Sequence, residues 1–340
     1  MVVPTNRTTV LGSKVLNIQR NTGLFVISID VEMAWGRVHH GDGAAPDSRF
    51  ADERRSVAAL LDLMEQHEIA ATWAVVGHLF LDGCSPVNGL HHPEVLRAPY
   101  PWFSGDWFAD DPATSARGES SWYAPDLIEA IKACPVNQEI GSHSFSHQII
   151  GDPACDADTF RSELTACREA AAKSGVQLRS FVYPRNSIGD QQVLTEHGFV
   201  AYRGPTPPRF PERSWLVRPF LNLGDSIIPV EATAVYPSME GKLCNVPQTY
   251  FFDPDSRIAR LLGRHLWPKV IIRRLDQAAR HGSLFHLWFH SHDVARAPDR
   301  ALEGLDQLFR AAAREREAGT LLNMTMGQVA RRFNNAPVKP

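Results

Sequence analysis

Positive charge is not in excess in this sequence. The 340 residues include 35 Lys and Arg against 38 Asp and Glu, which gives a formal net charge of −3. A protein that holds nucleic acid non-specifically needs a basic surface field, so we expect no nucleic-acid partner. With 44% hydrophobic and 21% charged residues, the composition is that of a globular protein able to build a sizeable core.

Cysteine is scarce, and long apolar runs are missing. The five cysteines are widely spaced and form no C-x-x-C pair, so we expect reduced thiols rather than a paired-cysteine zinc or redox motif. The longest nearly apolar stretch, residues 69–81, falls well short of the roughly 20 residues that cross a bilayer. Residues 1–19 show neither the apolar core nor the cleavage site of a secretory signal. These absences predict a cytoplasmic location.

Short apolar runs alternate with longer amphipathic segments, a pattern typical of βα units around a parallel sheet. The expected strands are residues 24–29, 69–76, 139–142, 178–183, 199–202 and 283–289. The expected helices are residues 52–67, 125–133, 156–174, 191–197, 255–281 with a break at Pro268, and 298–318, followed by a strand–helix unit over 320–333. Two stretches escape the pattern, residues 84–123 and 204–248, and are predicted to be long loop insertions. The pattern indicates an N-terminal extension, residues 1–20, and one barrel-like domain over residues 21–335.

Polar side chains follow several of these strands. In parallel α/β folds the carboxyl ends of the strands meet at one edge, where active sites form. The residues at these ends are Asp30 and Glu32, His143 and His147, Arg185, and His290 and His292. Nearly all belong to metal-ligand or acid/base types.

His143 and His147 are four residues apart, so a helical turn would point both imidazoles at one ion. With a carboxylate from Asp30 or Glu32, they form a ligand set suited to Zn²⁺. The alternative for the histidine pair is a surface or core position without metal. The alternative for the acids is a solvated loop position or a cap for a following turn, but an unpaired charge ending an apolar strand is costly.

The histidines near residue 290 have different expected roles. His286 lies inside the apolar strand and is expected to be a core residue with its hydrogen bonds satisfied. His290 stands at the strand end, where an imidazole can protonate a leaving group near neutral pH.

With these residues placed, the sequence resembles the polysaccharide deacetylase family, also called NodB-homology or carbohydrate esterase family 4. Residues 28–32 (Ser-Ile-Asp-Val-Glu) look like its first motif in an atypical Asp-x-Glu form. Residues 71–77 are similar to its Ala-Thr-Phe-Phe strand, and residues 139–147 match the His-Ser-x-x-His motif closely. Residues 183–186 (Tyr-Pro-Arg-Asn) and 288–290 (Trp-Phe-His) resemble the last two motifs.

The resemblance implies a distorted (β/α)₇ barrel and a metal-dependent hydrolysis that removes an acyl group, usually acetyl, from an amino-sugar nitrogen. Asp30 would be the general base and His290 the general acid, with His292 as the substitute. Glu32, His143 and His147 would bind Zn²⁺ or another divalent transition metal. Arg185 would orient the base, with Arg179 as its competitor. Alternatives are a deformylase, another small-amide hydrolase on the same fold, or a non-catalytic carbohydrate-binding protein.

The substrate predictions rest on two further segments. The first insertion, residues 84–123, is called the aromatic insertion below. It carries Trp102 and Trp107, whose rings could stack on a sugar or else pin the loop to the barrel. Tyr183 is a third substrate-binding candidate. The basic amphipathic stretch 257–274 could grip a phosphate or lie on anionic lipid, or be a solvated face. The predicted partner is an acylated amino sugar, a nucleotide sugar or a lipid-linked glycan, with possible peripheral membrane contact.

Overall fold

The computed structural model describes residues 14–15, 22–40, 47–117, 121–206 and 234–334. The strands are β1 Lys14–Val15, β2 Gly23–Val31, β3 Thr72–Val75, β4 Glu139–Ser142, β5 Ser180–Phe181, β6 Ala201–Tyr202, β7 Ser238–Glu240, β8 Leu243–Asn245, β9 Tyr250–Phe251, β10 Leu284–His290 and β11 Leu321–Asn323. The α-helices are α1 Asp47–His67, α2 Pro125–Ala133, α3 Ala157–Lys173, α4 Gln191–Glu196, α6 Arg257–His281, α7 Ser291–Arg296, α8 Pro298–Glu317 and α9 Met326–Asn334. Three 3-10 helices are η1 Met33–His40, η2 Gly77–Phe80 and η3 Pro184–Asn186.

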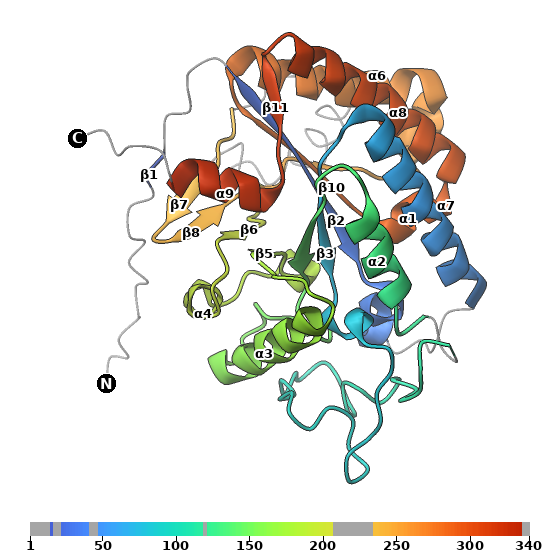
Figure 1. Cartoon of the computed structure of the whole chain (residues 1–340), viewed down its shortest axis with the longest axis vertical. Helices are drawn as coiled ribbons and strands as arrows, with labels where there is room; N and C mark the ends of the chain where they lie inside the picture. The colour runs from blue at the N-terminus through green and yellow to red at the C-terminus, as the bar shows by residue number, and fades with distance from the viewer. Residues whose placement is uncertain (1–13, 16–21, 41–46, 118–120, 207–233, 335–340) are drawn as a thin grey trace.

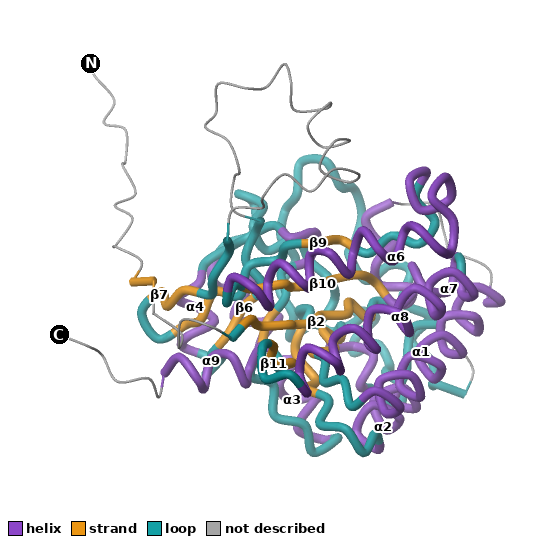
Figure 2. Tube along the Cα trace, turned by 90° about the horizontal axis from the view of Figure 1, so that it is seen from above, coloured by secondary structure: helices purple, strands orange, loops and turns teal. Residues whose placement is uncertain are grey.

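All strands belong to one curled sheet, which Figures 1 and 2 show surrounded by helices. Its order is β1-β7-β8-β6-β5-β4-β3-β2-β10-β9, and β11 pairs with β2 beside this path. The pairs from β9 to β8 are parallel, and only the additions of β7 and β1 are antiparallel among the described strands. The order does not close into a full cylinder within the described residues. The predicted α/β fold of the distorted-barrel type is confirmed.

Strand β2 lies at the centre of the fold. It pairs along its length with β10, in a register that places Asp30 opposite His290. On its other side, β11 pairs with the first residues of β2 and β3 pairs with the last ones. The strand end that carries Asp30 therefore lies between two parallel neighbours whose own ends point the same way.

Side-chain alternation along β2 separates two apolar cores. Phe25, Ile27 and Ile29 face the larger core, which α1, α2, α3, α6 and α8 cover. Leu24 and Val26 face a smaller core that is closed by apolar side chains of α9. Because the period of a strand is two, Ser28 and Asp30 continue the second face. This face is apolar under α9 and becomes polar toward the carboxyl end of β2.

The break in the long helix α6 lies at Gly263 and not at Pro268, which corrects the prediction. Gly263 has φ 65° and ψ −173°, a conformation that glycine adopts without a Cβ clash. Pro268 lies inside the following helical segment, where it cannot donate to the carbonyl oxygen of Arg264. The side chain of Gln307 on α8 donates to that oxygen instead, at 3.3 Å. A neighbouring helix thus accommodates the proline.

The aromatic insertion runs below α2 and α3 in Figure 1 as a long loop. Among its described residues, strand-like pairing is limited to the isolated bridges Gly83↔Ser115 and Val87↔Leu90. Much of the second predicted insertion (207–233) and most of the N-terminal extension lie outside the described residues. No helix in the described part of the chain is long and apolar enough to cross a membrane.

Candidate active site

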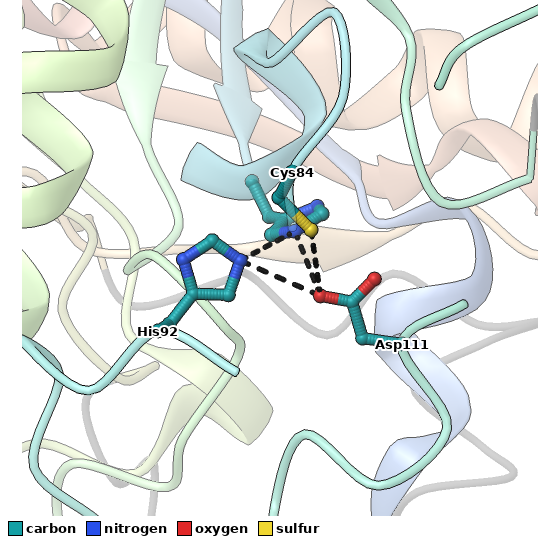
Figure 3. A group of neighbouring side chains, drawn as sticks. Cys84, His92 and Asp111 are labelled. Atoms are coloured by element: carbon teal, nitrogen blue, oxygen red, sulfur yellow. Dashed lines mark hydrogen bonds and ion pairs between the residues drawn. The ribbon is translucent and has the colours of Figure 1, made fainter. Parts of the chain in front are cut away.

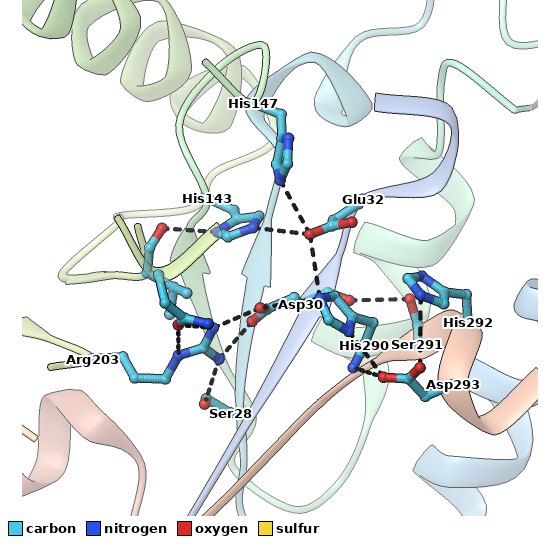
Figure 4. A network of polar contacts seen from close by, with 12 residues as sticks. Ser28, Asp30, Glu32, His143, His147, Arg203, His290, Ser291, His292 and Asp293 are labelled. Carbon is cyan, nitrogen blue, oxygen red and sulfur yellow. Dashed lines mark hydrogen bonds and ion pairs between the residues drawn. The ribbon is translucent and has the colours of Figure 1, made fainter. Parts of the chain in front are cut away.

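Asp30 is a buried carboxylate held by an arginine. Its side chain is 2% exposed, and Arg203, immediately after β6, is 1% exposed. Arg203 donates from Nη1 to Oδ1 at 2.8 Å and from Nη2 to Oδ2 at 2.6 Å (Figure 4). Burial alone would raise the pKa of Asp30, but Arg203, His143 and His290 outweigh it and lower that pKa. Asp30 is thus an ionised acceptor with a fixed orientation.

A chain of hydrogen bonds fixes Arg203 in turn. Its guanidinium donates to Asn186 Oδ1, at 3.0 and 3.2 Å, and to Ser28 Oγ at 3.1 Å. Ser28 contacts His286 Nε2 at 2.9 Å, and His286 Nδ1 donates to the carbonyl oxygen of Val246. Burial lowers the pKa of His286 to about 3, so it is a neutral core histidine. The guanidinium also lies 4.5 Å from the ring of Trp288, a cation–π contact.

Glu32, His143 and His147 converge at the end of β2. Oε1 of Glu32 lies 3.1 Å from Nε2 of His143 and 3.2 Å from Nε2 of His147, and all three side chains are buried. His143 Nδ1 donates to the carbonyl oxygen of Val182, which leaves the lone pair of neutral His143 on Nε2, facing the carboxylate. A Cβ on Gly36 would clash with Oε2 of Glu32, so only glycine leaves room for this position of Glu32.

This arrangement fits a divalent metal ion. Ligand nitrogen and oxygen atoms bound tetrahedrally at about 2.0–2.1 Å are about 3.3 Å apart from one another. The two separations from Glu32 are close to that value, and the three side chains form one group of possible metal ligands. A lone pair directed at a carboxylate oxygen is unfavourable unless a cation or a proton lies between them. The donor set therefore suits a metal.

The segment from His143 to His147 is not the helical turn that would explain its spacing. It is an irregular loop in which Ser144 has φ 60° and His147 has φ 64°. The buried carboxylate of Glu163 on α3 fixes this loop. It accepts from the backbone N–H groups of Phe145 and Ser146, at 2.7 and 2.9 Å, and from the Ser146 hydroxyl. Two left-handed residues, held by one acid, aim both imidazoles at Glu32 (Figure 4).

His290 faces both acids from the end of β10. Its Nε2 is 3.7 Å from Glu32 Oε1 and 3.9 Å from Asp30 Oδ2, and its Nδ1 is 2.9 Å from Asp293 Oδ2. Burial works against the charged form, but Glu32, Asp293 and Asp30 raise the pKa of His290 to about 9. His292 stacks on His290 with ring centroids 4.7 Å apart and contacts Asp293 at 3.7 Å. Between these two candidates, His290 is the one directed at Asp30 and Glu32.

The predicted orienting role of Arg185 does not agree with its position. Arg185 is exposed, with φ 55°, on the short helix η3, and Arg179 is exposed and donates to Gln177. The neighbouring Asn186 contributes to the site instead, by accepting from Arg203. Sequence reasoning missed Arg203 and Glu163. Arg203 directly follows an expected strand, and that position is the only local signal for it.

The three predicted substrate-binding aromatic residues differ in exposure. Trp102 is 45% exposed, and its Nε1 donates to Asp152 Oδ2. Trp107 is 2% exposed, and its Nε1 donates to the carbonyl oxygen of Ser146. It therefore supports the loop of residues 143–147, the histidine loop, and has no face free for a sugar. Tyr183 is fully buried, with its ring 4.8 Å from that of Phe181. Burial thus corrects the predicted stacking role for Trp107 and Tyr183.

Glu53 on α1 is buried beside the site, and its protonation is expected to affect stability. Burial raises its pKa from the usual 4.5 to about 7, with Glu32 adding to the rise, while Ser291, His290 and Arg54 oppose it. Because the folded state binds this proton more tightly, its contribution to stability is complete below pH 4.5. That contribution is lost as the pH rises to about 7, and it amounts to roughly 3 kcal/mol.

The Glu53→Gln variant is expected to remove this component. Urea unfolding of both proteins at a series of pH values measures it as a difference in unfolding free energy. The wild type should lose stability relative to the variant between pH 4.5 and 7. A difference that stays constant across that range would contradict the assignment.

Comparisons with known proteins concern the family and the fold. Residues 45–202 match the family model described as polysaccharide deacetylase. No curated protein matches the chain. A Mycobacterium smegmatis structure assigned as a polysaccharide deacetylase is 16% identical, with a TM-score of 0.56 over 98% of this chain and 99% of that one. A Pseudomonas aeruginosa PAO1 structure with the same assignment is 15% identical, with a TM-score of 0.56 over 93% and 92%. A PuuE allantoinase structure is 14% identical, with the same TM-score and coverage as the latter.

Proposed function

We propose that this chain is a member of the polysaccharide deacetylase family, whose model matches residues 45–202, and that it hydrolyses the N-acyl group of an amino sugar or surface-polysaccharide precursor. Acetyl is the first acyl group to test, and Zn²⁺ is the first metal. One observation carries the proposal. His290 lies within 4 Å of both Asp30, which Arg203 orients, and Glu32, at a site that also holds His143 and His147.

The residues divide the chemistry of amide hydrolysis. A divalent ion held by Glu32, His143 and His147 would polarise the amide carbonyl and lower the pKa of a bound water. Asp30 accepts the proton of the attacking water, and Arg203 positions its carboxylate for that transfer. His290 donates a proton from Nε2 to the departing nitrogen, while Asp293 holds its Nδ1. The products are a carboxylate and a free amine.

The fold alone does not distinguish deacetylation from the hydrolysis of another kind of amide. An allantoinase structure is as similar to this chain as the deacetylase structures are, with a TM-score of 0.56. A deformylase would use the same residues on a smaller acyl group. A carbohydrate-binding protein without catalysis would need no buried acid, base and ligand set together, so the site favours an enzyme.

The source of the sugar is a further part of the proposal. Helix α6 carries the basic stretch that could hold the phosphate of a nucleotide sugar or lipid-linked glycan. Leu261 and Leu266 on this helix are 80% and 54% exposed, and Arg264 lies between them. Such a face is compatible with peripheral contact with an anionic membrane. Vesicle sedimentation with anionic and neutral lipids, before and after Leu261→Ser, tests that contact.

Release of acid from defined substrates tests the proposed activity. The zinc-loaded chain is incubated with N-acetyl and N-formyl amino sugars, free and as nucleotide sugars, and with allantoin. We expect acetate release from an amino sugar, and its loss in Asp30→Asn. Formate release alone, or turnover of allantoin alone, would replace the proposal by the corresponding alternative. No turnover of any substrate by a chain that carries metal would favour the binding protein.

The two insertion tryptophans are expected to respond differently to mutation. Trp102→Ala should raise KM several-fold with little change in thermal stability, because Trp102 is 45% exposed. Trp107→Ala should lower the unfolding free energy by about 3–5 kcal/mol, since it empties a buried aromatic position under the histidine loop. Thermal melts and steady-state kinetics on both variants measure this. Equal destabilisation, with KM unchanged in Trp102→Ala, would argue against substrate stacking.

A further inference from the structure

A second group of metal-ligand side chains, one on η2 and three in the aromatic insertion, lies apart from the site described above. His78, Cys84, His92 and Asp111 each offer one ligand atom, and these atoms all lie within 4.8 Å of one another. Figure 3 shows Cys84, His92 and Asp111 pointing toward one another from separate turns of the loop. The side chains of His78 and Asp111 are fully buried and that of His92 is 9% exposed. None of these residues takes part in the proposed hydrolysis.

Their spacing is that of a tetrahedral site. Oδ2 of Asp111 lies 3.2 Å from His78 Nε2, 3.4 Å from His92 Nε2 and 3.3 Å from Cys84 Sγ. The two Nε2 atoms are 3.0 Å apart. Nitrogen and oxygen ligands around one zinc ion stand about 3.3 Å from each other, and a sulfur ligand slightly farther. Two further polar side chains border the cluster: the Tyr123 hydroxyl, which lies 3.1 Å from Cys84 Sγ and donates to Asp111 Oδ1 at 3.2 Å, and His91, whose Nδ1 is 3.9 Å from Asp111 Oδ2.

The hydrogen bonds around the cluster show where the two imidazoles carry their protons when both rings are neutral. His78 Nδ1 faces the carbonyl oxygen of Trp122 at 3.1 Å, and His92 Nδ1 faces the carboxylate of Glu94 at 3.1 Å. Both partners only accept, so each Nδ1 carries the proton, and a neutral ring has its lone pair on Nε2. The two lone pairs of neutral rings then face each other and a carboxylate oxygen, which is unfavourable unless a cation or an added proton lies between them. Outer partners of this kind are typical of metal-bound histidines.

We propose that His78, Cys84, His92 and Asp111 bind a second zinc ion, with a structural role. Four protein ligands close the coordination shell, as in structural rather than catalytic zinc sites. Cys84 binds as a thiolate and releases its proton to solvent. One thiolate and one carboxylate then balance the charge of Zn²⁺, so the buried site is neutral overall.

The position of this site gives the ion a function. The insertion has little regular structure among its described residues, and the ion would join the 3-10 helix η2 to three points along the loop. The backbone N–H groups of Gly77 and His78 donate to the carbonyl oxygens of Ser144 and Phe145. The ring of Phe145 packs on those of His78 and His92, at 5.6 and 5.1 Å. The second ion would therefore brace the loop that carries His143 and His147.

Cobalt distinguishes the two sites because only the second has a sulfur ligand. The full chain is stripped with a chelator, loaded with Co²⁺ and examined for a thiolate-to-cobalt charge-transfer band. We expect the band in the wild type and in the matched control Cys134→Ser, and its loss in Cys84→Ser. We also expect it in His143→Ala/His147→Ala, since the catalytic ligands are not involved. This readout is independent of activity, so it stands or fails separately from the proposed hydrolysis.

Zinc content and thermal stability complete the test. The zinc-loaded wild type should hold about two ions per chain, and both Cys84→Ser and the double histidine variant about one. Cys84→Ser should also melt at a lower temperature than Cys134→Ser. A wild type without the charge-transfer band, or with the band unchanged in Cys84→Ser, would overturn the proposal. The four side chains would then be held together by shared protons. The wild-type comparison decides the question even if the double variant does not fold.

Discussion

The His143→Ala/His147→Ala variant is expected to lose hydrolytic activity by about 10³-fold or more, together with about one metal ion per chain. Both Nε2 atoms lie within 3.2 Å of Glu32 Oε1, so the variant leaves this carboxylate as the single remaining ligand of the group. A single carboxylate ligand binds a transition metal too weakly to retain it in dilute solution. Elemental analysis and acetate release on the same preparation measure both effects.

A matched control separates the metal site from a general loss of histidine. His265→Ala/His281→Ala removes two exposed histidines from α6, far from the strand ends. This control should keep the activity and the metal content of the wild type. A histidine-loop variant that retained full activity would show that the reaction uses another part of the chain.

Replacing Arg203 with Met is expected to cost about 3–5 kcal/mol of unfolding free energy and at least about 10²-fold in kcat/KM. Arg203 makes both of its strongest hydrogen bonds to Asp30, and both residues are buried. Without it, Asp30 is an uncompensated charge in a site with few other donors. Urea unfolding and steady-state kinetics measure the two losses.

Two further variants test whether Arg203 positions the acid or only stabilises the fold. Arg203→Lys keeps the charge but not the paired contacts, so it should recover most of the stability and only part of kcat. Arg185→Met removes the exposed arginine of η3 and should behave as the wild type in both measurements. If Arg185→Met lost activity while Arg203→Met did not, the orienting role would return to Arg185.

Asp30, Glu32 and the two histidines could be found from the sequence because the signal for each lies in its own neighbouring residues. Asp30 ends an apolar strand, and the carboxyl ends of parallel strands meet at one edge, so the pattern itself predicts where the acid lies. Arg203 follows a strand of two residues, and β3, β4 and β5 lie between that strand and β2 in the sheet order. Its approach to Asp30 depends on the curvature of the whole sheet. No local pattern contains that information.

The backbone conformation of the histidine loop and the contacts within the aromatic insertion could not be predicted from the sequence either. The His-Ser-x-x-His spacing is compatible with a helical turn, whereas the loop uses left-handed conformations at Ser144 and His147. Glu163 on α3 accepts hydrogen bonds from Phe145 and Ser146 in this loop, and its contribution comes from another part of the sequence. The four side chains of the second cluster have irregular spacing along an irregular loop. No spacing pattern in the sequence therefore distinguishes Cys84 from the other four cysteines, all of which were expected to be reduced thiols.

The place of β2 in the sheet has a consequence for how the chain reaches its folded state. This strand precedes β3 to β11 along the chain, whereas β10 and β11, two of its three neighbours, are synthesised after all the other described strands. Until then one long side of an apolar strand has no permanent partner, and such edges attract other chains. The proposed catalytic pair, Asp30 and His290, joins the ends of β2 and β10. The pairing around β2 is therefore completed only after β10 and β11 have been made, and contacts this distant along the chain slow folding.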